Sequence, residues 1–179
     1  SLLNTDWDSD FVIEASSKQI SGDETEGYGI VFRSGGQNND FYYFIVSRSG
    51  SYSFGERIGG EYRSLIAWTS SENLYSYSYN KLKIKRIGSQ LKLYINGSYE
   101  KSFYSYSALG KGEKVGFLVS GVQKVGVDYL KFYNGDGSNS NGSQAKGSVG
   151  KSSLVYEENF VNNNDKWEGT VLDGYLSFR

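Results

Sequence analysis

Catalytic chemistry in this chain is restricted to carboxylate, tyrosine and lysine side chains. Its 179 residues include no histidine, cysteine, methionine or proline. This composition excludes cysteine nucleophiles, histidine general bases, Ser-His-Asp triads and Cys/His zinc sites. Glycoside hydrolysis is the commonest reaction that needs only two carboxylates, and Glu14 and Asp128 are the candidate pair. Both occupy polar positions between apolar ones, as expected for half-buried strands, so we predict that the protein is not an enzyme.

Tyrosine is the most abundant aromatic residue, with 16 copies beside 10 phenylalanines and 3 tryptophans. In residues 75–79 (YSYSY) and 104–106 (YSY) the rings alternate with serine, so an extended backbone would place them on one side. Exposed tyrosine makes contact surface at low entropic cost, and aromatic faces stack on sugars. Two interpretations remain open: the rings pack the edges of the fold, or they form a glycan-binding platform. The platform would consist of Tyr77, Tyr79, Tyr104 and Tyr106.

Three carboxylates near the start of the chain are a candidate metal site. Asp6, Asp8 and Asp10 alternate along the sequence, so an extended strand would turn them one way. Oxygen-rich clusters suit calcium, but Phe11 and Ser17 stand where an EF-hand loop needs glycine and glutamate. The alternatives are a calcium site and a solvated acidic strand start, and no other cofactor is expected.

The charges of the chain nearly balance. There are 19 lysines and arginines against 20 aspartates and glutamates, a formal net charge of −1. Nucleic-acid-binding domains carry an excess of basic residues, so we expect no nucleic-acid partner. No run of about 18 apolar residues is present, so we expect no membrane span.

The elements that must position these residues are short strands. Apolar residues fall on every second position in residues 82–85, 91–95 and 115–119, and turn dipeptides such as Asn96-Gly97 separate such segments. The pattern predicts a two-sheet antiparallel sandwich, with Trp68 in its core because residues 65–68 are almost all apolar. The predicted strands are 11–20, 27–33, 40–47, 51–57, 61–68, 80–87, 90–96, 98–104, 113–120, 124–133, 154–160 and 170–179.

A change in composition divides the chain into three parts. Residues 1–133 carry most of the predicted strands and form the main β-sandwich. Residues 134–153 are rich in glycine, serine and asparagine and are predicted to be a flexible linker. Residues 154–179 contain a small apolar island that is too short to form a core alone, so they must complete this sandwich or a neighbouring one.

Eight short motifs, in order along residues 10–132, resemble a concanavalin A-like (laminin-G-like) jelly-roll domain, nearest the 3-keto-disaccharide hydrolase-like branch. The motifs are DFVIEA at 10–15, GYGIVFR at 27–33, FYYFI at 41–45, AW at 67–68, NKL at 80–82, LKLYING at 91–97, KVGF at 114–117 and VDYLKF at 127–132. The resemblance implies an all-β, two-sheet antiparallel jelly roll. It implies no sugar-cleaving activity, because the Glu-x-Asp-x-x-Glu strand usual in sugar-cleaving relatives is absent.

The opening segment usual in that family stands at the end of this chain. Residues 158–167 (ENFVNNNDKW) and 173–178 (DGYLSF) resemble the segments that normally precede the DFVIEA strand, and joining Arg179 to Ser1 would restore the family order. The sequence therefore looks circularly permuted, or cut out of phase from a tandem array.

A jelly roll that lacks its opening strands exposes unpaired strand edges, and these must be filled. Residues 154–179 either fold back onto their own domain or complete the next copy by β-strand addition, which would build a head-to-tail fibre; a third alternative is a fragment of a tandem protein. The complementing side chains would be Leu154, Val155, Tyr156, Phe160, Trp167, Tyr175, Leu176 and Phe178.

The preferred hypothesis is therefore a non-catalytic extracellular module, the subunit of a surface fibre or adhesin repeat assembled by strand donation. Its partners would be neighbouring copies of itself. The alternative is a monomeric carbohydrate-binding module with glycan partners, followed by a glycosidase-like enzyme.

Overall fold

All regular structure in the described part of the chain is β-strand. The computed structural model describes residues 7, 9–35, 40–104, 114–135, 153–159, 170–172 and 175–177. No helix long and apolar enough to cross a membrane occurs among these residues. The strands are β1 (Phe11–Gly22), β2 (Gly27–Gly35), β3 (Asp40–Ser47), β4 (Ser51–Ile58), β5 (Glu61–Ser70), β6 (Asn80–Ile87), β7 (Gln90–Ile95), β8 (Ser98–Tyr104), β9 (Lys114–Val119), β10 (Gln123–Asn134), β11 (Ser153–Asn159), β12 (Thr170–Leu172) and β13 (Tyr175–Ser177).

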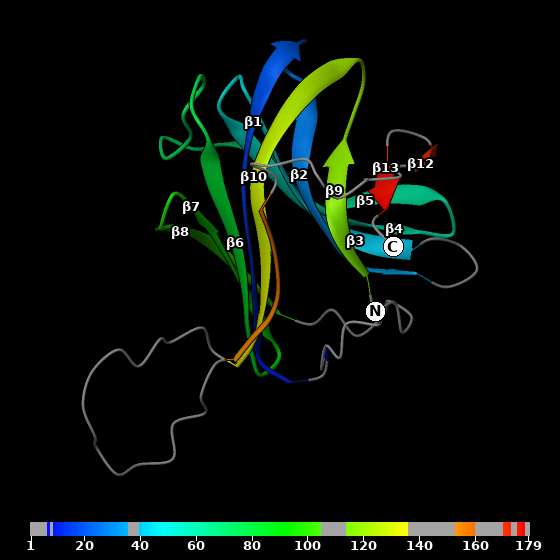
Figure 1. Cartoon of the computed structure of the whole chain (residues 1–179), viewed down its shortest axis with the longest axis vertical. Helices are drawn as coiled ribbons and strands as arrows, with labels where there is room; N and C mark the ends of the chain where they lie inside the picture. Colours follow the sequence, from blue (N-terminus) through cyan, green and yellow to red (C-terminus); the bar gives the residue numbers. More distant parts are fainter. Residues whose placement is uncertain are drawn as a thin grey trace.

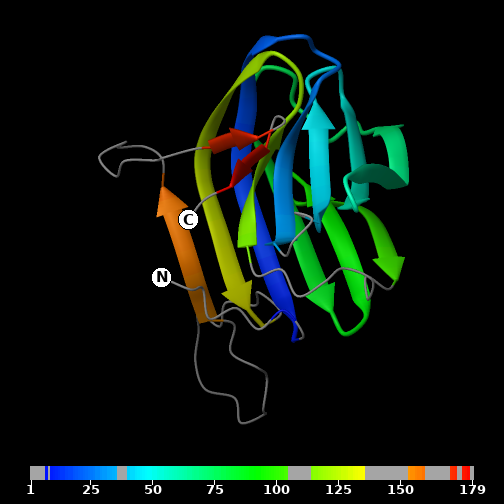
Figure 2. The same cartoon turned by 90° about the vertical axis from the view of Figure 1, so that its right-hand side faces the viewer.

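The strands form two antiparallel sheets that pack face to face (Figures 1 and 2). Sheet A has the order β11-β10-β1-β6-β7-β8, and sheet B has the order β12-β13-β9-β2-β3-β4-β5. The predicted all-β antiparallel jelly-roll sandwich is confirmed. The last predicted strand, 170–179, is instead two short strands that pair with each other, β12 and β13.

The alternation of apolar residues predicts which side chains are buried. In β7, Leu91, Leu93 and Ile95 are fully buried, whereas Lys92 and Tyr94 between them are half-buried. The Asn96-Gly97 turn that follows has positive φ at both positions, 52° and 89°, as a two-residue hairpin of type I′ requires. This hairpin is confirmed.

Aromatic side chains dominate the core between the sheets. Trp7 is only 5% exposed, and its ring centroid lies 5.3 Å from that of Phe11 and 5.0 Å from that of Phe132. Phe32 of sheet B packs on Phe11 of sheet A with the ring centroids 6.3 Å apart. Each such ring buries a large apolar area, and its edge-to-face contacts add a further stabilisation of about 0.5–1.5 kcal/mol.

Two asparagines hold the segment before β6 in place. Asn80 is 1% exposed; its Oδ1 accepts hydrogen bonds from the Tyr75 backbone N–H at 2.8 Å and from Asn96 Nδ2 at 2.9 Å. Its Nδ2 donates to the Tyr75 carbonyl oxygen at 2.8 Å. The buried Asn80 side chain therefore supplies the hydrogen bonds that a neighbouring strand would otherwise give to the backbone of Tyr75.

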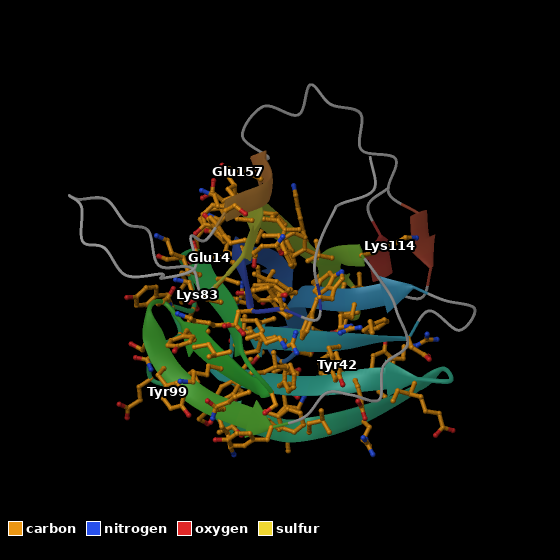
Figure 3. The ribbon with its side chains drawn as sticks, turned by 90° about the horizontal axis from the view of Figure 1, so that it is seen from below. Glu14, Tyr42, Lys83, Tyr99, Lys114 and Glu157 are labelled. Atoms are coloured by element: carbon orange, nitrogen blue, oxygen red, sulfur yellow. The ribbon has the colours of Figure 1, made fainter. Side chains whose placement is uncertain are left out.

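The outer face of sheet A carries a row of alternating charges, Glu157, Lys131, Glu14 and Lys83, paired across β11, β10, β1 and β6 (Figure 3). Lys83 Nζ lies 2.8 Å from Glu14 Oε2, and Lys131 Nζ lies 2.9 Å from Glu157 Oε1. The hydroxyl of Tyr129 donates to Glu14 Oε1 at 2.7 Å. Burial alone would raise the pKa of Glu14, but the hydrogen bonds from Lys83 and Tyr129 outweigh it and lower the pKa below its ordinary value.

Replacing Asn80 should destabilise the fold. The Asn80→Ala variant leaves the Tyr75 backbone groups and the Asn96 amide without their buried partner, so we expect the free energy of unfolding to fall by about 1–3 kcal/mol. Urea denaturation followed by tryptophan fluorescence measures this loss. Ser70→Ala, at an exposed position of β5, is the control and should change little. Equal stability of the two variants would show that the amide network contributes nothing.

The lowered pKa of Glu14 predicts a contribution to acid stability. A folded-state pKa below the unfolded value means that the carboxylate stabilises the fold above its ordinary pKa, and that this stabilisation is lost as the pH falls through the folded-state pKa. Between about pH 5 and 3, the free energy of unfolding should therefore fall more steeply in the wild type than in Glu14→Gln. Urea denaturation across this range checks the slope. Lys83→Met should flatten it too, and parallel curves for all three proteins would contradict the prediction.

Candidate functional site

The outer face of sheet B carries a second apolar layer. Strand alternation places Ile30, Phe32, Tyr42 and Phe44 in the main core, and the residues between them on the other face. An outward face is polar where water covers it, so an apolar outer layer needs an explanation. The layer consists of Val31, Phe41, Tyr43, Ile45 and Leu118, all of which are buried.

Tyr62 of β5 lies over one end of this layer. Its ring centroid is 6.0 Å from the centroids of both Phe41 and Tyr43. The side chain is nevertheless 54% exposed. Tyr62 therefore covers the buried rings on one side and presents aromatic surface on the other.

Trp68, near the other end of β5, lies over Ile45 and Gly27. A Cβ atom built on Gly27 would lie 3.2 Å from Trp68 Cη2 and 2.8 Å from Ile45 Cδ1. Gly27 precedes Val31 by four residues on β2 and so shares its outward face, which places the indole on this face of sheet B. The side chain is 48% exposed, so the predicted position of Trp68 in the core is wrong.

Two register shifts between β4 and β5, one on each side of Ile66, explain the outward position of Trp68. Gly55 lies opposite Ser64, Phe54 opposite Ile66 and Tyr52 opposite Thr69, so β5 has one extra residue before Ile66 and another after it. The first extra residue turns Ile66 into the core, and the second reverses the alternation again, so Trp68 faces outward. The run of apolar residues at 65–68 gave no sign of this reversal, because a bulge depends on the partner strand.

Two glycines allow the aromatic side chains to lie close to the sheet. A Cβ atom on Gly55 would collide with the Tyr43 ring, whose hydroxyl group lies 3.3 Å from Ser64 Oγ. Gly27 leaves the equivalent space beneath the Trp68 indole. Any side chain at either position would have to displace a ring.

Arg57 adds a polar group to the same face. Its guanidinium carbon lies 5.9 Å from the ring centroids of both Phe41 and Tyr62, within the range of a cation–π interaction. Together, Tyr62, Trp68, Arg57 and Ser64 place two partly exposed rings and several hydrogen-bonding groups on one surface, which we call the aromatic face. Such a surface suits a ligand with both apolar and hydroxyl-rich sides.

The structure does not bring the predicted tyrosine platform together. Tyr79 directly precedes β6 at one end of the sandwich, whereas Tyr104 pairs with Gln90 where β7 begins, at the opposite end. Tyr77 is 77% exposed beside Arg48, and Lys18 lies over the Tyr79 ring. Tyr106 lies outside the described residues. Tyr79 and Tyr104 therefore do not belong to one platform, and a glycan-binding role for any of the four tyrosines stays a prediction.

The predicted calcium site lies mostly outside the described residues, because Asp6 and Asp8 are not among them. Asp10 Oδ1 accepts a hydrogen bond from the Gly88 backbone N–H at 2.7 Å, an interaction that orients the β6–β7 turn. Within the described ranges, no group of three or more metal-ligating side chains is gathered.

The two carboxylates considered for catalysis lie on neighbouring strands but in different settings. Glu14 is held by Lys83 and Tyr129, as described above. Asp128 lies in β10 at the register shift between Val127 and Tyr129. A carboxylate bound by an ammonium group and a phenol is poorly placed to act as a nucleophile.

The predicted complementing segment extends both sheets. β11 pairs with β10 and β13 pairs with β9 of the same chain (Figures 1 and 2). Leu154 in β11 is 49% exposed, and Tyr175 and Leu176 pair with Leu118 and Phe117. Val155 and Tyr156 are in β11, where Tyr156 lies opposite Phe132. Phe160, Trp167 and Phe178 lie outside the described residues.

Comparison with solved structures shows the fold. The bacterial carbohydrate binding module CBM66 from Bacillus subtilis matches with a TM-score of 0.58 and 18% identity, over 69% of this chain and 74% of that one. A point variant of human galectin-16 matches with a TM-score of 0.57 and 15% identity, over 71% and 89% of the two chains. Sheep galectin-11, solved in complex with glycerol, matches with a TM-score of 0.52 and 11% identity, over 69% and 89%.

Neither a protein-family profile nor a curated protein sequence matches the chain. At these low identities, the structural matches show the fold alone, a two-sheet jelly-roll sandwich.

Proposed function

We propose that the protein is a non-catalytic carbohydrate-binding module whose ligand lies on the aromatic face of sheet B. The observation that carries the proposal is the Trp68 indole, which lies over Gly27 and Ile45 and yet remains 48% exposed. A large ring held in this way offers a rigid surface at little entropic cost. The apolar side of a sugar ring can stack on it.

The polar groups beside the rings would orient such a ligand. Arg57 lies over Tyr62, and Ser64 lies beside Tyr43, so donors and acceptors surround the stacking surface. Small-molecule sites commonly combine aromatic walls with a few placed polar groups. CBM66, which shares the fold, is named as a carbohydrate binding module, and this supports the proposal.

Three finer points remain proposals. An extracellular location suits a module that binds polysaccharides. The resemblance to the 3-keto-disaccharide hydrolase-like branch stays a proposal, and we propose no activity from it. Calcium is not required by the proposed aromatic face, and a calcium site would have to use residues other than those named there.

Removing the Trp68 ring should abolish most of the binding. We expect Trp68→Ala to weaken the affinity for a glycan selected on a glycan microarray by about tenfold or more, since the stacking surface is lost, and Trp68→Phe to lose less. Titration calorimetry measures the affinity, and circular dichroism checks that the fold is kept.

Tyr77→Ala is the matched control for this experiment, because Tyr77 is an aromatic residue with 77% exposure outside the aromatic face. It should bind as the wild type does. No binding to any glycan on the microarray, or a loss in Tyr77→Ala that equals the loss in Trp68→Ala, would refute the proposed site.

A second candidate function is a fibre subunit that assembles by strand donation. The observation that favours it is the position of β11 and β13. These strands pair with β10 and β9, although the connection of residues 135–152 separates them from both in the sequence. Without them, β10 and β9 would be open edges, which accept strands readily. In this alternative, the same pairs form between neighbouring copies.

Shortening the connection of residues 135–152 distinguishes closure within one chain from strand donation between copies. Asn134 and Ser153 pair directly, so a two-residue Asn-Gly turn in place of residues 135–152 should lock β11 onto its own β10. Strand donation predicts that the full chain forms assemblies larger than its mass of 20.0 kDa after concentrated refolding and that the short-turn variant stays monomeric. Light scattering over a dilution series measures the mass. A monomeric full chain at every concentration would reject the fibre.

A further inference from the structure

Lysines gather on the outer face of sheet A, on the opposite side of the sandwich from the aromatic face. In β6, Leu82 and Ile84 point into the core, so Lys81, Lys83 and Lys85 alternate with them on the outside. Lys92 occupies the same face of β7, between the buried Leu91 and Leu93. Residues 80–97 contain no aspartate or glutamate, although the whole chain has a net charge of −1.

Two of these lysines oppose each other directly. Lys85 pairs with Lys92 in the register of β6 and β7, which brings two like charges together across the strands. Like charges at directly opposite positions destabilise a sheet. Lys83 is neutralised by Glu14, but within the described ranges no carboxylate forms an ion pair with Lys81, Lys85 or Lys92. The sheet thus retains an unfavourable concentration of positive charge.

Tyrosine rings continue the same surface toward β8. Lys83 lies opposite Tyr94, and Tyr94 lies opposite Tyr99. The two rings form an edge contact with centroids 5.8 Å apart, and Tyr99 is 55% exposed. Figure 3 shows Glu14, Lys83 and Tyr99 on this sheet, with Lys114 across the molecule beside β12 and β13. The surface therefore combines a line of cations with adjacent aromatic rings.

We propose that this surface, formed by Lys81, Lys83, Lys85, Lys92, Tyr94 and Tyr99, binds an acidic polysaccharide. Along β6, Lys81 and Lys85 are four residues apart, a span of about 13 Å, so a linear chain with regularly spaced anionic groups can follow the strand. Carboxylate or sulfate groups would neutralise Lys81, Lys85 and Lys92, which have no ion pair in the described ranges, and would relieve the repulsion between Lys85 and Lys92. The tyrosines would contact the sugar rings between the charges.

The charge balance of the chain favours a polysaccharide over a nucleic acid. A net charge of −1 provides no general attraction to the dense charge of duplex DNA, and the cations form one short row. A polysaccharide with one charge per sugar has a lower charge density and offers apolar ring faces to Tyr94 and Tyr99. The site is independent of the aromatic face, so the protein would hold two different glycans on its two outer faces.

Binding of the 179-residue chain to polygalacturonate and to dextran sulfate tests this proposal, with neutral dextran and duplex DNA as comparison ligands. We expect at least one of the two acidic polysaccharides to bind. Which of them binds shows whether the site recognises carboxylate or sulfate groups. The affinity should fall as the salt concentration is raised. The double variant Lys85→Gln, Lys92→Gln should bind about tenfold more weakly. The matched control Lys114→Gln, Lys124→Gln removes the same charge elsewhere and should bind like the wild type.

Two further readouts keep the proposal falsifiable. The Lys85→Gln, Lys92→Gln variant should melt at a temperature no lower than the wild type, because it removes a repulsion, so its loss of binding cannot be unfolding. Trp68→Ala should bind polygalacturonate and dextran sulfate normally, which separates this site from the aromatic face. Equal losses in the two lysine double variants, tighter binding to duplex DNA than to both acidic polysaccharides, or no binding to either of them would overturn the proposal.

Discussion

Packing of the two sheets against each other is the constraint on which the other features of this protein depend. The interior between the sheets accepts only one side of each strand, and large rings such as Phe11, Phe32 and Phe132 fill it completely. Every second side chain must therefore face outward. The two outer faces then diverge: sheet B carries aromatic and apolar residues, and sheet A carries lysines and a row of ion pairs. The same packing that builds one core also produces two surfaces with different chemistry.

The aromatic face depends on two interruptions of the alternation in β5, one on each side of Ile66. The first turns Ile66 into the core, and the second returns Trp68 to the outward side that Tyr62 and Ser64 occupy. Gly27 leaves room for the indole there. The paired irregularities thus let one strand contribute both a core residue and the main candidate for ligand contact. Burial of Val31, Tyr43 and Ile45 in turn supports this outer layer from below.

The last strands raise the question of how the domain is closed. β11 and β13 each add a strand beside β10 and β9, which follow one another in the sequence. The ion pair between Lys131 and Glu157 joins β11 to the charged row of sheet A, and Glu157 raises the pKa of Lys131. Since these contacts depend only on local pairing, the same strands can satisfy them from within one chain or from a neighbour. Loop-closure entropy favours closure within one chain at low concentration.

How much the sequence alone determines is clearest from particular elements. The period-2 pattern of β7, the Asn96-Gly97 hairpin and the ranges of nearly all strands follow from local chemistry, because alternation and turn geometry are properties of a few consecutive residues. The absence of histidine and cysteine from the sequence also excluded histidine, cysteine and Cys/His zinc chemistry from the start. The outward turn of Trp68, the separation of Tyr79 from Tyr104, and the opposition of Lys85 and Lys92 could not be read in the same way. Each depends on which residue of another strand lies opposite, and only the tertiary structure decides the register between strands.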